Sequence, residues 1–398
     1  MLAPTVPPLS HSARAVRASV FSDLAPRLNA RLARGETLHP LHIGDTWRAP
    51  PRCASLSAHA SDDPALYRYG PLGGTPSLLA AIAHHLDATG RALDGASPAK
   101  LLVAAGATHA LHCAARALFD AGDECLVLAP YWPLSVGVLR VAGATPVEVP
   151  VLPALATDPR FDLARALDDA VTPRTRAVYF ITPNNPDGFV MGEDHLEAIA
   201  DVARRRDLWV IADEVYADYA YEGAHRSIAR LPGMAERAVS AYSLSKSHAL
   251  AGLRVGYVAG PEALIAAARK VATHTVFNVP VVAQRAAEAA ITEGEPFIAE
   301  ARDAYRLARD TTVRALAGRV DFVAPAGGSY VFADLSRALR GGSALELLGR
   351  AIDAGVALAP GDAFGEGYGH WARLCFTAVP PDALDDALAR LTRVLDGG

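Results

Sequence analysis

The sequence contains very little lysine. Lys100, Lys246 and Lys270 are the only three among 398 residues, so arginine supplies 35 of the 38 basic side chains. Few positions can therefore offer an ε-amine for covalent chemistry. The arginine bias, combined with abundant alanine, is typical of genome composition rather than of a particular function.

Cysteine is scarce as well, and its spacing is uninformative for metals. Cys53, Cys113, Cys125 and Cys375 are scattered without the intervals of a metal site, and Cys113 and Cys125 fall in apolar stretches. This pattern indicates reduced, mostly buried thiols in a cytoplasmic protein. No metal site is expected.

Several classes of protein are disfavoured by what is missing. The N-terminus, Met1-Leu2-Ala3-Pro4, lacks the charged region and apolar core of a secretory signal. No apolar run is long enough to span a bilayer. The net charge of −5 argues against a basic nucleic-acid face. We therefore expect no membrane or nucleic-acid partner.

The composition that is present favours an α/β enzyme. Hydrophobic residues make up 51% and charged residues 20%, enough for a large core and roughly two domains. Short apolar runs alternate with helical patterns, which predicts a mostly parallel sheet covered by helices on both faces. The expected strands cover residues 101–105, 125–128, 177–181 and 208–212, and the expected helices cover residues 77–86, 109–119 and 193–206.

The two ends of the chain differ from this alternating region. Residues 1–16, rich in Pro, Ser and Ala, predict a loose arm. A long amphipathic pattern over residues 295–317 predicts one helix that leads out of the sheet domain. The remainder, from Val320 to Gly398, predicts a smaller α+β domain.

Two candidate motifs follow expected strands. Gly106-Ala107-Thr108 joins a strand to a helix N-terminus, where free N–H groups and the helix dipole favour a phosphate. Asp213 closes the strand at 208–212 and could hold a protonated ring nitrogen, while Tyr216 could donate to a phenolate oxygen. Taken singly, the first fits an ordinary connection and the second a solvated loop residue or a helix cap.

A third candidate is the turn from Thr182 to Gly188. Its Pro, Asn and Gly content is typical of a rigid turn, and an Asn amide in it could also donate to the phenolate oxygen.

The lysine of greatest interest lies in Ser243-Leu244-Ser245-Lys246, eight residues before Arg254. Hydroxyl and guanidinium groups suit a phosphate dianion, and a primary amine among them can hold a phosphorylated aldehyde as a Schiff base. A lone Ser-x-Ser-Lys would fit a surface lysine equally well. The order of Asp213, Lys246 and Arg254 makes coincidence much less plausible.

Together these motifs resemble the class I/II aminotransferases, fold type I pyridoxal-phosphate (PLP) enzymes of the aspartate-aminotransferase-like superfamily. The resemblance extends from about residue 40 onward. The matching segments, in the family's order, are Ile43-Gly44-Asp45, Tyr69-Gly70-Pro71 with Gly73-Gly74, Gly106-Ala107-Thr108, Pro130-Tyr131-Trp132, Asn184 to Gly188, Asp213 to Tyr216, Ser243 to Lys246, Gly252 to Tyr257, Pro360-Gly361 with Phe364-Gly365, and Arg373 to Phe376.

The resemblance implies a role for each matching residue. Lys246 would form the Schiff base and shuttle the substrate proton, Asp213 would hold the pyridinium, and Tyr216 would bind the ring oxygen. Arg373 would bind the substrate α-carboxylate. The other implied cofactor contacts are Ala107, Thr108, Trp132, Asn185, Ser243, Ser245, Arg254 and, from a neighbouring subunit, Tyr69; the other implied substrate contacts are Gly44 and Asn185.

The family also implies an organisation and a reaction. We expect an arm and the start of the small domain at residues 1–44, a large PLP-binding domain at 45–294 and a small C-terminal domain at 295–398. The expected assembly is a homodimer with shared active sites. The expected reaction moves the amino group of an amino acid to a 2-oxo acid by a ping-pong mechanism.

The sequence departs from the family pattern at specific points. Asp187 stands where the pattern usually has Thr, and no counterpart is evident for the second arginine of dicarboxylate-specific members, which questions a preference for aspartate or glutamate. Residues considered for the substrate side are Phe21, His42, Trp47 and Phe277, although each also fits simple packing.

Two alternatives to transamination remain open at this point. Other PLP chemistry on an amino acid, such as elimination, cyclisation or decarboxylation, uses the same motifs. A PLP-binding regulator would need a DNA-binding domain, but only about 40 residues precede the first motif and they show no helix-turn-helix pattern.

Overall fold

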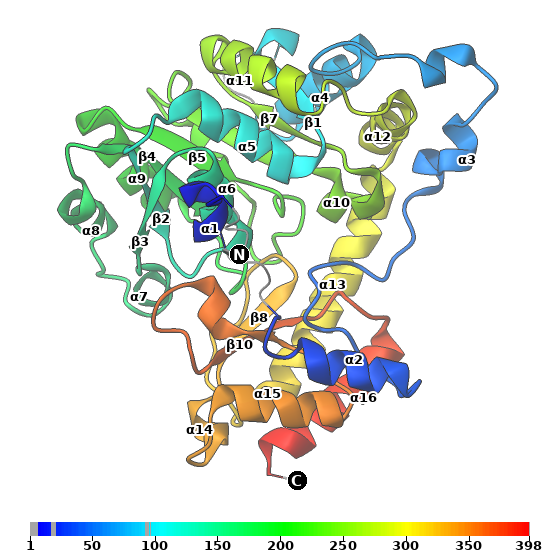
Figure 1. Ribbon diagram of the computed structural model, residues 1–398, viewed down its shortest axis with the longest axis vertical. Coiled ribbons are helices and arrows are strands. Elements are labelled where there is room, and N and C mark those ends of the chain that lie inside the picture. The colour runs from blue at the N-terminus through cyan, green and yellow to red at the C-terminus, as the bar shows by residue number, and fades with distance from the viewer. Residues whose placement is uncertain (1–6, 17–20, 92–94, 96, 398) are drawn as a thin grey trace, which may run out of the picture.

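Two β-sheets organise the computed structural model, which describes residues 7–16, 21–91, 95 and 97–397 (Figure 1). The larger sheet has the strand order β1-β7-β6-β5-β4-β2-β3, and the smaller one has the order β8-β10-β9. The strands are β1 (Leu101–Ala104), β2 (Glu124–Leu128), β3 (Thr145–Val149), β4 (Thr175–Ile181), β5 (Trp209–Asp213), β6 (Ala238–Ser243), β7 (Gly256–Ala259), β8 (Tyr330–Asp334), β9 (Ala359–Pro360) and β10 (Trp371–Cys375).

The large sheet confirms the expected α/β class. All neighbouring strands are parallel except β7, which is antiparallel to both β1 and β6. The expected strands at 101–105, 125–128, 177–181 and 208–212 correspond to β1, β2, β4 and β5. β3, β6 and β7 had no counterpart among the expected strands.

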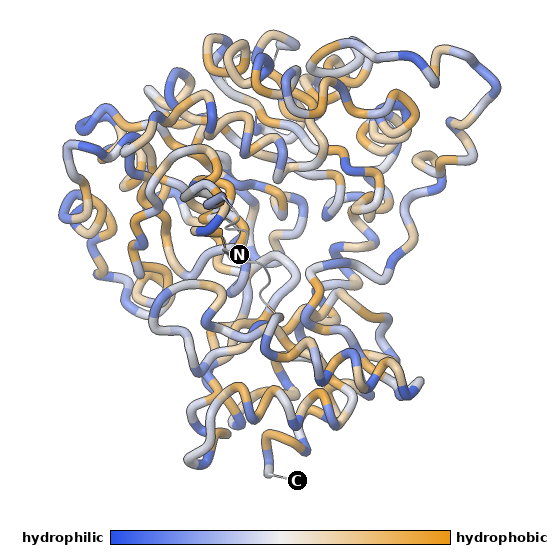
Figure 2. Tube along the Cα trace, viewed as in Figure 1, coloured by the Kyte–Doolittle hydropathy of each residue, from blue (hydrophilic) through white to orange (hydrophobic). Residues whose placement is uncertain are grey.

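Helices cover both faces of this sheet. α5 (Gly106–Leu118), α6 (Pro133–Val141) and α11 (Glu262–Thr275) pack on one face, and α7 (Leu152–Thr157), α8 (Leu163–Ala170) and α9 (Glu193–Arg205) pack on the other. α4 (Pro76–Ala88) and α12 (Val281–Glu293) pack together beside β1 and β7. Along the outer helices, hydrophobic residues alternate with hydrophilic ones, as expected for helices with one buried face (Figure 2).

The small sheet is entirely antiparallel and lies below the large one in Figure 1. α13 (Glu295–Leu316) leads from the large-sheet part of the chain to the small sheet, and it is the single long helix that the sequence predicts. The other helices around the small sheet are α2 (Ala25–Ala33), α14 (Ser336–Leu339), α15 (Ala344–Asp353) and α16 (Pro381–Leu395). α2 packs against α15, so the early part of the chain joins this core. The domain boundaries at residues 44 and 294 remain a prediction.

The N-terminal arm is more ordered than the sequence predicts. His11–Ala15 form a short helix, α1, that lies against α6. The Ser10 hydroxyl caps it by accepting from the Ala13 N–H, and Arg140 donates to the Ala15 carbonyl at 3.2 Å. These contacts replace the expected loose arm over the described part, whereas residues 1–6 lie outside the described residues.

Three short elements lie between α2 and α4. They are α3 (Leu56–His59) and the 3₁₀ turns at Arg52–Ala54 and Pro64–Tyr67. Within the described residues, no helix combines the length and the apolarity needed to cross a bilayer.

Candidate active site

The predicted site residues meet at one edge of the large sheet. β4, β5 and β6 are parallel, so the turn around Asn185, the carboxylate of Asp213 and the segment with Lys246 all follow strand ends at the same edge. β1 also ends at this edge because β7 runs antiparallel to both β1 and β6. Open α/β sheets bind ligands at such an edge.

A cavity of about 230 Å³ opens there. Every residue for which the resemblance implies a cofactor or substrate contact, except Tyr69, lines it. Its lining consists of Gly44, Ala107, Thr108, Trp132, Ile181, Asn185, Asp213, Val215, Tyr216, Ser243, Ser245, Lys246, Ala251, Arg254, Tyr330 and Arg373.

Lys246 is carried by a one-turn helix at the end of β6. This helix, α10 (Leu244–Ser247), begins directly after Ser243, whose hydroxyl accepts from the Ser245 N–H at 3.1 Å. The Tyr219 hydroxyl donates to the Ser247 carbonyl at 2.7 Å and fixes the other end. Lys246 Nζ donates to the Gly44 carbonyl. These contacts hold the amine in the cavity.

The surroundings of Lys246 favour its neutral, nucleophilic form. Burial lowers the pKa of Lys246, and the nearby cations Arg373 and Arg254 lower this pKa further, although Cys375 and Asp45 act in the opposite direction. A lowered pKa leaves more of the amine unprotonated near neutral pH. Such an amine can attack a carbonyl carbon.

Asp213 is a buried carboxylate that forms no ion pair with another described residue. Its Oδ2 accepts from the Tyr179 hydroxyl at 3.0 Å, and its Oδ1 has only a long contact of 3.4 Å from the Val215 N–H. Burial raises the pKa of Asp213 to about 7, and the hydrogen bond from Tyr179 partly offsets this rise. A protonated ring nitrogen placed beside Asp213 would stabilise its charged form.

The N-terminus of α5 and Arg254 face each other across a narrow gap. A Cβ atom at Gly106 would collide with the Arg254 guanidinium, and one at Gly256 would collide with the Ala107 N–H. Arg254 itself has a left-handed backbone, with φ 53° and ψ 54°, which costs about 1 kcal/mol for a residue with a side chain. The free amides and the dipole at the N-terminus of α5, with the Arg254 guanidinium beside them, favour the binding of an anion.

Arg373 lies on β10 of the small sheet and points to the same cavity. Its Nη1 donates to Asn185 Oδ1 at 2.8 Å and its Nη2 to the His42 carbonyl at 2.8 Å, while its buried Nε has no hydrogen-bond partner in the structure. Arg373 is only 6% exposed. A buried guanidinium without a carboxylate partner is suited to bind one from a ligand.

The charges of this cavity require a ligand of a particular kind. Across the described part of the chain, Asp213, Arg254 and Arg373 form no ion pair. The site therefore offers two positions for anions, at Arg254 and Arg373, and one for a cation, at Asp213, in the same cavity as the amine of Lys246. Pyridoxal phosphate together with an amino-acid carboxylate fits this set, since it supplies a phosphate, a ring nitrogen, an aldehyde and a carboxylate.

The turn after β4 keeps Asn185 in place. Asn184 donates from its Nδ2 to the Pro130 carbonyl at 3.0 Å and to Asp187 Oδ1 at 2.8 Å, and the Phe189 N–H donates to the same oxygen at 3.0 Å. Asp187, where the family pattern has Thr, is thus a structural acceptor. Burial raises the pKa of Asp187 to about 6.

Some predicted residues lie away from the cavity. Tyr69 is 86% exposed and its ring lies 4.9 Å from that of Phe277. Phe21 and His42 pack edge to face at 4.8 Å, and burial lowers the pKa of His42 to about 4. None of the four substrate-side candidates lines the cavity, and a role for them toward the substrate remains a prediction.

Two tyrosines near the site were not anticipated. Tyr179 belongs to an apolar strand and Tyr330 opens the smaller sheet. The period-two alternation of a strand was the available signal for Tyr179, because it puts residue 179 on the same face as residue 181 at the strand end. No pattern in the sequence indicated that Tyr330 would reach the cavity.

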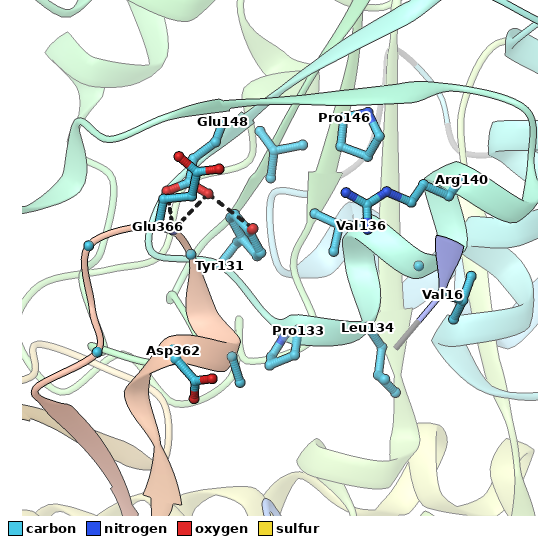
Figure 3. Close-up of a pocket in the computed structure, with 16 residues that line it drawn as sticks. Val16, Tyr131, Pro133, Leu134, Val136, Arg140, Pro146, Glu148, Asp362 and Glu366 are labelled. Carbon is cyan, nitrogen blue, oxygen red and sulfur yellow. Dashed lines mark hydrogen bonds between the residues drawn. The ribbon is translucent and has the colours of Figure 1, made fainter. Parts of the chain in front are cut away.

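A second, larger cavity of about 550 Å³ is lined by Tyr131, whereas the neighbouring Trp132 lines the Lys246 cavity (Figure 3). There, Glu148 accepts from the Tyr131 hydroxyl at 3.1 Å and from the Glu366 N–H at 2.8 and 3.0 Å. Burial raises the pKa of Glu148, and the charge of Glu366 raises it further. These bonds tie β3 to the segment before β10, and none of the predicted site residues takes part.

Comparisons with known proteins agree with this geometry. Residues 36–391 match the family model of aminotransferase class I and II. The aspartate/prephenate aminotransferase of Thermus thermophilus is 35% identical over 334 residues, covering 82% of this chain and 83% of that protein. The arginine–pyruvate transaminase of Pseudomonas aeruginosa is 35% identical over 347 residues, covering 86% of each.

Solved structures show the same similarity in three dimensions. A single mutant of the Thermus thermophilus aspartate aminotransferase superposes with a TM-score of 0.89 at 30% identity, covering 98% of this chain and 100% of that one. The N-succinyldiaminopimelate aminotransferase of Mycobacterium tuberculosis gives a TM-score of 0.87 at 29% identity, covering 97% and 100%.

Proposed function

We infer that this chain, which belongs to the class I and II aminotransferase family, uses the Lys246 cavity to move an amino group from an amino acid to a 2-oxo acid. Its relatives are aminotransferases, and the family depends on pyridoxal phosphate. The chain is accordingly a PLP-dependent aminotransferase. What we propose is the role of each residue.

The residues fall into three groups according to the part of the cofactor that each would contact. The α5 N-terminus at Ala107 and Thr108, with Ser243, Ser245 and Arg254, would hold the phosphate. Asp213 would hold the protonated ring nitrogen, and Trp132 would stack on the ring. Tyr216 and Asn185 would donate to the ring oxygen; Asn185 already uses its Oδ1 on Arg373, which leaves its Nδ2 to donate.

The chemistry of the cofactor, when bound, is an aldehyde that links to an amine and a ring that withdraws electrons from the substrate carbon. Lys246 Nζ would hold the aldehyde carbon first. Once the substrate amine has replaced it, Lys246 Nζ would take the proton from the substrate α-carbon as a general base. Arg373, with Gly44 close by, would hold the α-carboxylate and so fix which bond faces Lys246.

We further propose a homodimer with shared active sites. Tyr69 would reach the phosphate of the neighbouring subunit. Support comes from its exposure of 86% and from the exposed aromatic and apolar side chains close by in the sequence or packed on it, which suit an interface. We also propose a cytoplasmic location, in keeping with four cysteines that form no disulfide.

The observation that carries the proposed function is a single cavity that holds Lys246 together with Asp213 and Arg373, neither of which forms an ion pair within the described part of the chain. Borohydride reduction of the cofactor-loaded protein, followed by peptide mass spectrometry, should place the cofactor on Lys246. With only three lysines in the chain, Lys100 and Lys270 serve as internal controls. The label on either of those two would refute the assignment.

Activity then tests the same residue. Lys246→Ala should lose amino-group exchange by several orders of magnitude, while Lys270→Ala, at an exposed position of α11, should keep it.

The shared site has its own test. Separately inactive Lys246→Ala and Tyr69→Ala proteins, mixed and allowed to exchange subunits, should regain activity because one of the two sites in the mixed dimer is intact. No recovery despite subunit exchange would reject the proposed role of Tyr69.

A further inference from the structure

Tyr330 contacts both halves of the active site. It starts β8 in the small sheet, is 1% exposed and lines the cavity. Its hydroxyl lies 2.6 Å from that of Tyr216, and the two rings meet edge to face with their centroids 5.7 Å apart. This is a direct hydrogen bond between a residue after β5 and a residue of the small sheet.

The ring of Tyr330 also supports Arg373. The guanidinium carbon lies 4.2 Å from the Tyr330 ring centroid and 5.0 Å from that of Phe364. The strand register explains the contact with Tyr330, since Tyr330 pairs with Cys375, two residues after Arg373 on the same face of β10. A buried guanidinium held between two aromatic rings keeps its orientation before any carboxylate arrives.

A third contact concerns the loop that carries Gly44. A Cβ atom at Gly44 would collide with the Tyr330 hydroxyl, so this hydroxyl needs glycine there. The carbonyl of Gly44 accepts from Lys246 Nζ. Tyr330 therefore also shapes the approach of the loop that holds the amine.

The donor in the hydrogen bond between Tyr216 and Tyr330 follows from the role proposed for Tyr216. Burial raises the pKa of Tyr216 well above its ordinary value and that of Tyr330 to about 12, so each hydroxyl keeps its single proton near neutral pH. If Tyr216 donates to the ring oxygen of the cofactor, its proton is used there. The hydroxyl of Tyr330 must then donate to the oxygen of Tyr216.

We propose that Tyr330 is a positioning residue that strengthens the donation of Tyr216 to the cofactor through its hydroxyl and fixes Arg373 through its ring. The inference rests on the proposed function of the cavity. It assigns one side chain to both the cofactor side and the substrate side of the reaction. Because the two contacts use different parts of the side chain, they can be separated.

Tyr330→Phe removes the hydroxyl and keeps the ring. Without a donor, Tyr216 becomes a weaker donor to the ring oxygen, whose ionised form is then less stable. The pH midpoint of the absorbance change of the bound cofactor should rise by roughly half a pH unit or more, and kcat should fall. KM for the amino acid should stay within about twofold because the ring still supports Arg373. An unchanged or lowered midpoint would overturn the hydroxyl's role.

Tyr330→Leu removes the ring as well. KM should then rise by roughly 3- to 30-fold, beyond the effect of Tyr330→Phe. Equal KM values in the two variants would overturn the ring's role. Tyr257→Phe serves as the control, since Tyr257 is buried, stacks on Tyr242 and does not line the cavity; it should leave both quantities unchanged.

The wild-type protein separates this inference from the proposed function. Its pH-dependent absorbance must disappear in Lys246→Ala. If the wild type has no such absorbance, the proposed function and the inference fall together. If the wild type has it and Tyr330→Phe matches the wild type, only the inference falls.

Discussion

The hydroxyl of Tyr179 donates a 3.0 Å hydrogen bond to Oδ2 of Asp213, from one parallel strand to its neighbour. Both side chains are almost fully buried, at 1% and 2% exposure. The burial that raises the pKa of Asp213 to about 7 is opposed by this donor. Tyr179 thereby helps Asp213 to stay ionised, which is the form that attracts a protonated ring nitrogen.

Tyr179→Phe should therefore raise the pKa of Asp213 above 7. A carboxyl whose pKa lies above 7 is mostly uncharged at pH 7, so the attraction of Asp213 for a protonated ring nitrogen weakens. We expect cofactor affinity at pH 7 to fall roughly tenfold, with most of it recovered at pH 9, where Asp213 ionises again. Equilibrium dialysis of cofactor between pH 6 and pH 9 measures this. The same loss at every pH would mean that Tyr179 acts only through packing.

Arg373→Lys should weaken substrate binding although it keeps the charge. Lysine cannot donate at once to Asn185 Oδ1, to the His42 carbonyl and to a bidentate carboxylate. We expect kcat/KM to fall about 100-fold, mainly through KM. Steady-state kinetics measures the effect, with Arg319→Lys, a surface arginine paired with Asp396, as the control. Kinetics equal to wild type would remove Arg373 from the carboxylate site.

Gly106→Ala should damage the anion site more than it damages the fold. The added Cβ collides with Arg254, and the positive φ of 79° adds strain. Gly122→Ala is a matched control because its φ is 99° but no atom lies within 4 Å of the new Cβ. Both variants should lose about 1 kcal/mol of stability, whereas only Gly106→Ala should lose cofactor affinity, by roughly tenfold or more. Equal cofactor affinities would contradict the proposed phosphate site.

Asp187→Asn should change how stability depends on pH. The folded pKa of Asp187, about 6, lies above the value of 3.8 for an exposed carboxyl, so folding favours its protonated form. That contribution is complete below pH 3.8 and is lost as the pH rises through 6. Asparagine stays neutral and keeps the Oδ1 acceptor for Asn184 and the Phe189 N–H.

Above pH 7 we expect Asp187→Asn to be more stable than wild type by up to roughly 3 kcal/mol, with the difference shrinking toward pH 4. Denaturant unfolding at several pH values measures this, and Asp62→Asn at an exposed position is the control. A constant difference across pH would show that Asp187 does not titrate near 6.

Much of the fold was predictable because buried strands and helices have regular hydrophobic patterns in the sequence. β4 and β5 are apolar on both faces, so they appear as continuous hydrophobic runs. α13 was predictable from its amphipathic repeat. β3 was not, since it is a half-exposed edge strand with Pro146 inside it. β6 and β7 carry serines, glycine and tyrosines that do not form an apolar run.

The site was predictable where its residues lie at the ends of recognisable strands. Asp213 and the Gly106 turn belong to that set, and the structure gathers them in one cavity with Lys246. Lys246 follows β6, which has no apolar run, and was indicated instead by its Ser-x-Ser-Lys motif and by Arg254. Tyr330 could not be found in this way because its role depends on how the small sheet is placed against the large one. Short-range patterns carry no information about such long-range packing. Short-range patterns do not indicate a residue contributed by another subunit either, so the role proposed for Tyr69 was expected only from the family resemblance.

The cavity is lined by residues from both β-sheets. Lys246, Asp213 and Arg254 come from elements of the large sheet, whereas Arg373 and Tyr330 come from the small one. A ligand whose carboxylate binds Arg373 and whose amine lies near Lys246 would therefore contact both sheets at once and link them. Substitutions in β10 can then alter how the substrate carboxylate is held while the large-sheet residues proposed to hold the phosphate and the ring nitrogen stay as they are.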